Sequence, residues 1–249
     1  MDALAGKRII VTGGAGGIGG AAVQYFIEQG AKVACTYNAT APELPKGVFS
    51  AQCDIASKAS VDASIDALVK ELGGLDGVVH AAGVHGFCAA EDLTEEMWDK
   101  TFALNAKATL FVNQAAFRHL KAAGGSIVNM GSCEGVRGFA SNACYAATRG
   151  AVMAFTRSVA LEWGRYKVRV NALAPVAETR LAQTMRERAD DAEKAAMDAY
   201  LQSAIPLGGK MGDPYQDIAP ILAFLMSDAS HFMTGQTVPA DGGFMMLGS

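Results

Sequence analysis

A glycine-rich run is the feature that most restricts how this chain folds. The run, VTGGAGGIGG, overlaps the end of an apolar stretch at Arg8–Thr12 and opens a segment with helical spacing of apolar residues. Glycine at Gly13 permits a tight turn, at Gly17 it lets backbone approach a pyrophosphate, and at Gly19 it lets the helix pack close to the strand. Amides at the start of that helix attract phosphate groups. The strand–turn–helix arrangement therefore predicts a dinucleotide-binding site.

Short β-branched runs alternate with longer helical patterns along the whole chain. This alternation predicts right-handed strand–helix–strand units and a parallel sheet. We therefore expect an α/β fold, a doubly wound parallel sheet with helices on both faces, in a single domain over residues 1–249. The expected strands are Arg8–Thr12, Lys32–Thr36, Val48–Gln52, Gly77–His80, Ser126–Met130, Val168–Leu173 and Thr237–Pro239, and the expected helices run from Ile18 to Gly30, Lys58–Leu72, Thr94–Ala123 and Cys144–Trp163.

Composition and charge argue against several classes of protein. The formal net charge is −4, whereas a nucleic-acid site needs a clustered basic face. The amino terminus lacks a signal-peptide pattern, and no apolar run reaches the roughly 20 residues that span a bilayer. The 5 cysteines include no Cys-x-x-Cys pair, and the histidines show no ligand-like spacing beyond His80 and His85. We expect a cytoplasmic protein with reduced thiols that binds no metal, membrane or nucleic acid.

Several further motifs occur in a fixed order after the glycine run. Ser132 stands 13 residues before Tyr145, and the chain reads Asp-Gly-Gly near its end. Together with the Thr-Gly-x-x-x-Gly-x-Gly form of the glycine run, these motifs resemble the short-chain dehydrogenase/reductase family, of the single-domain Rossmann type. The other matching positions are Asp54 and Ile55, Ala81 to Gly83, Asn105, Asn171 with Pro175, Thr179, and Asp241 to Gly243.

The resemblance implies a nicotinamide-dependent oxidoreductase that transfers hydride between its cofactor and a carbonyl or secondary alcohol. It implies four catalytic residues, which are Asn105, Ser132, Tyr145 and Arg149. The positions that it assigns to cofactor binding are Gly13, Gly17, Ile18, Gly19, Tyr37, Asn38, Asp54, Ile55, Ala82, Gly83, Tyr145, Arg149, Pro175 and Thr179.

An arginine stands where the family pattern leads one to expect a lysine. Residues four apart share one face of a helix, so Tyr145 and Arg149 can point into the same cleft. A nearby cation favours the phenolate and lowers a tyrosine pKa from its usual value near 10. A guanidinium remains protonated at any working pH, so it does not readily pass a proton onward. We therefore expect retained oxidoreductase activity, with Tyr145 as general acid and base and an altered pH profile.

The choice between NAD and NADP depends on the end of the second strand. Tyr37 and Asn38 stand where an NAD enzyme usually has an acidic residue for the ribose hydroxyl. The arginine or lysine that would favour a 2′-phosphate is also missing there, although Thr40 and Lys46 are near in sequence. The sequence slightly favours NADP over NAD.

Two other functions remain open at this point. Halohydrin dehalogenases resemble the family and use serine, tyrosine and arginine without a cofactor, but they have lost the glycine-rich fingerprint that is present here. A catalytically weak nucleotide-binding or sensor protein is favoured modestly by Ala81 and Val176, which replace an asparagine and a glycine of the family pattern.

The charged stretch Thr184–Ser203 interrupts the alternation and is expected to form an inserted helix over one end of the sheet. We expect residues 176–212 to form a substrate-loop insertion that shapes the pocket. The substrate class is a small carbonyl or alcohol. By resemblance, long helices at Thr94–Ala123 and Cys144–Trp163 are expected to pair in a homotetramer.

Overall fold

The computed structural model describes residues 3–246, and the side chains of these residues except at positions 180, 181 and 185. Its centre is a seven-stranded sheet in which every strand pairs in parallel, in the order β3-β2-β1-β4-β5-β6-β7. This confirms the doubly wound α/β fold predicted from the sequence. The strands are β1 (Arg8–Thr12), β2 (Lys32–Tyr37), β3 (Phe49–Gln52), β4 (Gly77–His80), β5 (Gly125–Met130), β6 (Val168–Pro175) and β7 (Thr237–Ala240).

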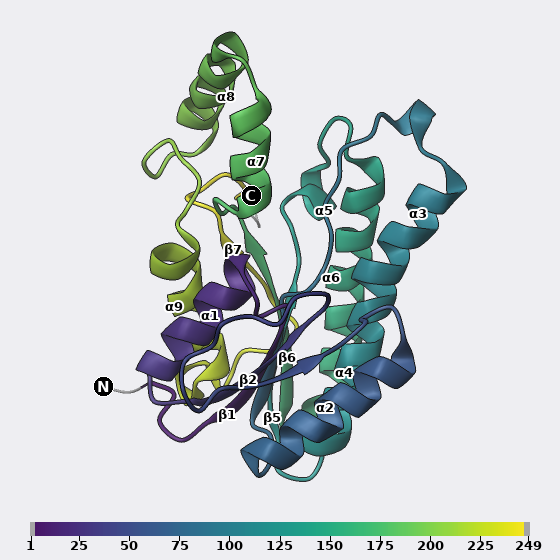
Figure 1. Cartoon of the computed structure of the whole chain (residues 1–249), viewed down its shortest axis with the longest axis vertical. Helices are drawn as coiled ribbons and strands as arrows, with labels where there is room; N and C mark the ends of the chain where they lie inside the picture. Colours follow the sequence, from purple (N-terminus) through teal and green to yellow (C-terminus); the bar gives the residue numbers. More distant parts are fainter. Residues whose placement is uncertain (1–2, 247–249) are drawn as a thin grey trace.

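Helices cover both faces of the sheet (Figure 1). On one face lie α1 and α9, and on the other lie α2, α4 and α6. The helices are α1 (Gly17–Glu28), α2 (Lys58–Leu72), α3 (Glu95–Phe102), α4 (Ala108–Leu120), α5 (Glu134–Arg137), α6 (Ala143–Trp163), α7 (Arg180–Arg188), α8 (Asp191–Ala204) and α9 (Ala219–Met226). Shorter 3₁₀ or π-helical turns lie at Ala90–Asp92, Ala103–Lys107, Gly164–Tyr166, Pro214–Ile218 and Asp228–Ser230.

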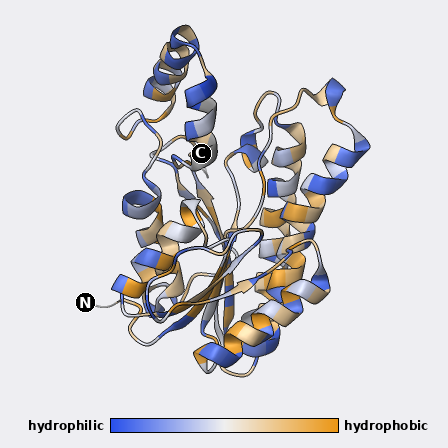
Figure 2. Cartoon of the chain, viewed as in Figure 1, coloured by the Kyte–Doolittle hydropathy of each residue, from blue (hydrophilic) through white to orange (hydrophobic). Residues whose placement is uncertain are grey.

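The apolar runs of the central strands form two cores, one on each side of the sheet. In β1, Ile9 and Val11 pack with the α1 and α9 side, whereas Ile10 packs with the α2 and α4 side. Successive side chains of a strand point to opposite faces, so a strand buried on both faces reads as continuous apolar sequence. Each such buried side chain contributes about 1.5–3 kcal/mol of transfer free energy. Figure 2 shows the hydrophobic residues concentrated along the sheet and the inner faces of the helices.

Two of the expected helices are interrupted. The helix expected over Thr94–Ala123 contains a π-helical turn at Ala103–Lys107, which separates α3 from α4. The helix expected over Thr184–Ser203 is instead two helices, because Asp190 caps a new one: its side chain accepts from the backbone N–H of Glu193, and the Glu193 side chain accepts from that of Asp190. This reciprocal capping starts α8 in a new direction.

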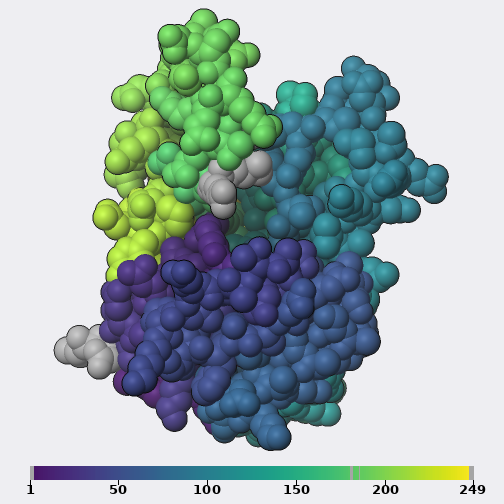
Figure 3. Space-filling view, in the orientation of Figure 1, coloured from purple at the N-terminus to yellow at the C-terminus, as the bar shows by residue number. Residues whose placement is uncertain are grey.

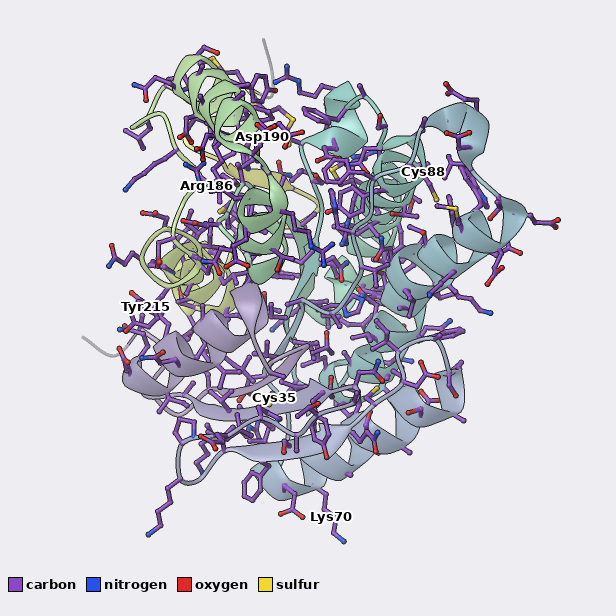
Figure 4. All side chains as sticks on the ribbon, turned by 45° about the horizontal axis from the view of Figure 1, so that its top comes forward. Cys35, Lys70, Cys88, Arg186, Asp190 and Tyr215 are labelled. Atoms are coloured by element: carbon purple, nitrogen blue, oxygen red, sulfur yellow. The ribbon has the colours of Figure 1, made fainter. Side chains whose placement is uncertain are left out.

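The pair of helices α7 and α8 projects beyond the sheet at the carboxyl ends of the strands (Figure 1). Many residues of this pair are hydrophilic (Figure 2). In Figure 4, Arg186 and Asp190 lie on this projection, opposite Cys88 in the segment between β4 and α3. That residues 176–212 act as a substrate loop stays a prediction.

Candidate active site

A cleft of about 410 Å³ opens at the carboxyl ends of β1, β2 and β4. Figure 3 shows the surface hollowed where the purple, green and teal segments of the chain meet. Parallel α/β sheets bind ligands at this edge. The cleft brings together most of the positions that the sequence assigned to cofactor binding: Gly13, Gly17, Ile18, Gly19, Tyr37, Asn38, Asp54, Ile55, Ala82, Gly83 and Thr179.

Glycine is required at two positions of the cleft by close backbone contact. A Cβ on Gly19 would lie 2.3 Å from the carbonyl oxygen of Gly13, so the start of α1 approaches the preceding turn as only glycine allows. Gly13 itself has a φ of 70°, and a Cβ there would lie 2.9 Å from the Cα of Ala82. The cleft floor is therefore bare backbone at the amino terminus of α1. A cleft of this shape and dipole fits the pyrophosphate of a dinucleotide.

Three predicted cofactor positions, Tyr145, Arg149 and Pro175, do not line this cleft. Sequence reasoning also missed several residues that do line it. Most adjoin predicted positions in the chain, and their strand ends or turns were the available signal. They are Gly16, Thr36, Cys53, Ala81, Val84 and Leu104.

Asn105 lies in the π-helical turn between α3 and α4 and is fully buried. Its Oδ1 accepts from the backbone N–H of Val84 at 2.9 Å, and its Nδ2 donates to the Val84 carbonyl at 3.0 Å. The same Nδ2 donates to the Thr148 hydroxyl at 3.1 Å. The amide thus joins the segment after β4 to helix α6, which carries Tyr145. Single π-helical turns are frequent at functional sites.

Arg149 lies beneath Tyr145 on α6 and is buried. Its guanidinium carbon is 4.8 Å from the centre of the Tyr145 ring, a cation–π contact. Nη1 donates to the Met130 carbonyl at 3.0 Å, at the end of β5, while Nε is buried without a partner. A Cβ on Gly83 would lie 3.0 Å from Nη2. The arginine therefore packs between the ring of Tyr145 and the wall of the cleft.

Ser132 follows β5 and is also buried. Its Oγ accepts from the backbone N–H of Glu134 at 3.2 Å. The Glu134 side chain contacts the Asn142 amide, and Asn142 Nδ2 lies 3.0 Å from His85 Nε2. The His85 ring meets the Tyr145 ring edge-on, with centroids 4.2 Å apart. We call His85, Glu134 and Asn142 the Glu134 cluster; it connects the Ser132 segment to Tyr145.

Comparisons with known proteins agree with this arrangement. The model of a family described as enoyl-(acyl carrier protein) reductase matches residues 13–245. The chain is 32% identical to an NAD-dependent glycerol dehydrogenase of Listeria innocua, over 96% of this chain and 93% of that protein. It is 35% identical to a D-threitol dehydrogenase of Mycolicibacterium smegmatis, over 97% and 94% of the two chains. The chain belongs to the short-chain dehydrogenase/reductase family.

The fold comparison gives the same family. Among solved structures, the ligand-free aldohexose dehydrogenase of Thermoplasma acidophilum superposes with a TM-score of 0.88 at 26% identity, over 98% of this chain and 97% of that one. The chain is therefore an oxidoreductase of the short-chain dehydrogenase/reductase family.

Within this family member, His80 lies at the boundary between the cleft and the Tyr145 region. It is fully buried at the end of β4, and its Nδ1 is 2.8 Å from the hydroxyl oxygen of Thr12. That oxygen also accepts from the backbone N–H of Ala82 at 3.2 Å, which shapes the cleft wall. Burial, with a smaller effect from the nearby Arg149 charge, lowers the pKa of His80 to about 3. The imidazole is therefore neutral at working pH.

Other kinds of site are not found in the part of the chain that the structure describes. None of its helices is long and apolar enough to cross a membrane. Over the same residues, no three histidine, cysteine, aspartate or glutamate side chains are grouped so that they could hold a metal ion.

Proposed function

We propose that this protein is an NAD(P)-dependent oxidoreductase that transfers hydride between a nicotinamide and a carbonyl or secondary alcohol, with Tyr145 as general acid and base. One observation carries the proposal. Gly83 lines the cleft, and a Cβ there would lie 2.9 Å from Asn105 Oδ1 and 3.0 Å from Arg149 Nη2. Two of the predicted catalytic side chains, Asn105 and Arg149, thus lie directly behind the wall of the glycine-floored cleft.

The residues of the cleft would hold the dinucleotide. Gly13, Gly17 and Gly19 would accommodate the pyrophosphate at the start of α1, and Tyr37 and Asn38 would border the adenosine ribose. Asp54 and Ile55 would flank the adenine, and Thr179 would lie at the nicotinamide end. When bound, the nicotinamide supplies or accepts the hydride.

The protein supplies the proton. Reduction of a carbonyl develops negative charge on its oxygen, and the Tyr145 hydroxyl is the acid that neutralises it. The Ser132 hydroxyl donates to the same oxygen and stabilises the developing charge. In alcohol oxidation the same groups act in reverse, and Tyr145 accepts the proton.

Arg149 places a positive charge against the ring of Tyr145. Its guanidinium is fixed by the Met130 carbonyl and lies against the tyrosine ring. It does not give up a proton at working pH. Asn105 acts as a positioning residue, because it ties α6 to the segment after β4.

The NAD-dependent glycerol dehydrogenase and the D-threitol dehydrogenase both act, by their names, on small polyols. A small alcohol is therefore the substrate class that we propose, with residues 176–212 closing over it. The cofactor preference follows from Tyr37 and Asn38. Neither side chain is an acidic group that would repel a 2′-phosphate or a basic group that would bind one, and we retain the slight preference for NADP.

The glycine floor distinguishes this function from the dehalogenase and sensor alternatives. In a protein that binds no cofactor, nothing would require the close approach of Gly19 to Gly13, which a Cβ at position 19 would prevent. A protein that only binds a nucleotide would not need three buried polar side chains, Asn105, Ser132 and Arg149, beside the cleft.

The quaternary structure is a further part of the proposal. Large apolar side chains are exposed on the two helical segments expected to pair, including Trp98 on α3 and Leu161 on α6. We propose a cytoplasmic homotetramer. Light scattering coupled to size-exclusion chromatography tests it, and a monomer would contradict it.

The first experiment is a titration of the purified protein with NADPH and with NADH, following nicotinamide fluorescence. Saturable binding of either supports the function, and the tighter one identifies the preferred cofactor. Binding of neither would remove the proposal and direct the next assay to halide release from a haloalcohol.

A second experiment tests the role of the arginine. In Arg149→Lys the cation is kept but can exchange a proton, so we expect the pH profile of kcat to change relative to the wild type. An unchanged rate and an unchanged profile would show that the arginine has no effect on proton transfer.

A further inference from the structure

The Glu134 cluster is the polar feature next to Tyr145 that the proposed mechanism does not use. Its members come from three separate segments: His85 follows β4, Glu134 begins α5, and Asn142 precedes α6. Glu134 is two residues from Ser132 and hydrogen-bonded to its Oγ, while His85 contacts the ring of Tyr145. The cluster therefore borders both residues proposed to contact the reacting oxygen.

The hydrogen bonds of Asn142 determine which atoms of the cluster act as donors and which as acceptors. Its Nδ2 faces Oε2 of Glu134, and a flipped amide would place two oxygens against each other. The second N–H of the same nitrogen then donates to His85 Nε2 at 3.0 Å. His85 Nε2 is consequently the acceptor in this hydrogen bond.

This arrangement leaves hydrogen-bonding capacity unused. Asn142 Oδ1 and His85 Nδ1 are buried without partners. The other carboxylate oxygen, Glu134 Oε1, lies 3.7 Å from His85 Nε2, beyond hydrogen-bond distance. The Glu134 side chain keeps 18% of its exposure, so a solute can reach it. Buried polar groups left unsatisfied in this way are rare, and a catalytic or binding role is one of their explanations.

We propose that Glu134 is a specificity-determining residue, whose Oε1 accepts a hydrogen bond from a second hydroxyl of the substrate. The substrate class is then a vicinal diol or polyol, with one hydroxyl at Ser132 and Tyr145 and the neighbouring one at the carboxylate. This inference rests on the proposed oxidoreductase function. Asn142 and His85 are positioning residues, because they hold the carboxylate with Oε1 free.

The negative charge of Glu134 also discriminates between neutral and negatively charged substrates. No lysine or arginine in the described part of the chain forms a salt bridge with this carboxylate. It therefore repels a substrate that carries its own carboxylate near the reacting carbon. Neutral diols are favoured over hydroxy acids of the same size.

The test compares three alcohols that differ at one position: 1,2-cyclohexanediol, its monomethyl ether and cyclohexanol. The ether keeps the second oxygen but has no proton to donate to a carboxylate. With the wild type, we expect kcat/KM for the diol to exceed that for the ether about tenfold or more, the effect of one hydrogen bond to a charged group. Calorimetric titration of diol and ether into protein holding the reduced cofactor gives the same comparison without turnover.

Glu134→Gln is the matched variant. Asn142 Nδ2 requires an oxygen opposite it, so the glutamine NH₂ takes the place of Oε1 and offers a donor where the diol needs an acceptor. We expect the diol-over-ether preference to fall to within about twofold, while kcat/KM for cyclohexanol changes less than about threefold. Glu71→Gln, at an exposed position of α2, is the control and is expected to keep the preference.

The outcomes separate the two proposals. Equal rates for diol and ether in the wild type, with cyclohexanol turned over, would overturn the inference alone. An equal loss for all three alcohols in Glu134→Gln would assign the cluster a purely structural role and also overturn it. No turnover of any alcohol with NAD or NADP would overturn the proposed function, and the inference with it.

Discussion

The cofactor cleft and the Tyr145 region meet at Gly83 but are built from different material. The cleft has a floor of backbone at the ends of β1, β2 and β4, with glycine at Gly13 and Gly19, where a Cβ would meet neighbouring backbone. The Tyr145 region consists of polar side chains from several segments, joined by hydrogen bonds and by the contact of the His85 and Tyr145 rings. A shape that depends on backbone tolerates few residue types, whereas a network of side chains can be altered one group at a time. Substitutions should therefore affect the two regions in different ways.

The largest expected effect separates chemistry from binding. Tyr145→Phe removes the proposed acid and keeps the ring against Arg149 and His85. We expect kcat to fall by about 10²–10⁴, the usual contribution of a positioned acid or base, with unchanged nicotinamide binding. Steady-state kinetics beside a fluorescence titration measures both quantities. A parallel loss of cofactor affinity would mean that the two regions are not independent.

The next effect is the converse, a loss of binding through shape. In Gly19→Ala the new Cβ would lie 2.3 Å from the Gly13 carbonyl oxygen, so the turn must shift. We expect nicotinamide nucleotides to bind at least about tenfold more weakly, or about 1.4 kcal/mol. Gly20→Ala is the control, because its Cβ meets backbone only at 3.6 Å, an ordinary contact. Equal affinities of the two variants would contradict the role given to Gly19.

The same contrast explains how much of the fold was predictable. The apolar runs in the sequence predicted every strand to within two residues at either end. Strands buried on both faces need such runs. The break at Asp190 and the π-helical turn around Asn105 were missed. Both depend on where a side chain finds its hydrogen-bond partner, and apolar periodicity carries no information about that.

For the site, the sequence predicted the residues of the cofactor cleft better than those of the Glu134 cluster. Gly13, Gly17 and Gly19 line the cleft because local turn geometry places them there. The link from Glu134 through Asn142 to His85 spans segments about 50 residues apart, and only packing of those segments shows it. One signal was present, a carboxylate two residues after Ser132. The catalytic and cofactor roles themselves stay proposals until the experiments are done.

A smaller effect concerns His80, at the boundary of the two regions. Its folded pKa of about 3 lies below the ordinary value of 6.5, so the unfolded chain binds the extra proton between these values. Stability is therefore complete above pH 6.5 and falls as the pH is lowered toward 3, by up to about 1.4 kcal/mol per pH unit.

His80→Asn should remove this dependence while keeping a polar atom near Thr12. Urea unfolding between pH 6.0 and about 4.5 measures the slope. This window lies above the pKa of Asp76 in both states, because that carboxyl has its usual pKa near 3.8 when unfolded and a lower one beside Arg8 when folded. Identical slopes in wild type and variant would show that His80 is protonated in the folded protein.

The smallest effect concerns backbone strain. Outside glycine, two described residues have positive φ: Ser141 at 57°, next to Asn142 of the Glu134 cluster, and Lys167 at 58°, in the turn before β6. The left-handed region costs about 1–2 kcal/mol for such residues, and glycine returns about 0.5–1 kcal/mol of that in chain entropy. Ser141→Gly and Lys167→Gly are therefore each expected to stabilise the protein by about 0.5 kcal/mol, measured by urea unfolding.

Only one of these variants should affect specificity. The carbonyl of Ser141 accepts from the backbone N–H of Cys88 at 2.8 Å, which ties the segment of His85 to that of Asn142 (Cys88 is labelled in Figure 4). A glycine at 141 loosens that connection, so the diol-over-ether preference should weaken in Ser141→Gly and remain in Lys167→Gly. If both variants keep the full diol-over-ether preference, the left-handed backbone at Ser141 matters only for the local turn. The Glu134 cluster is then held in place by its own hydrogen bonds.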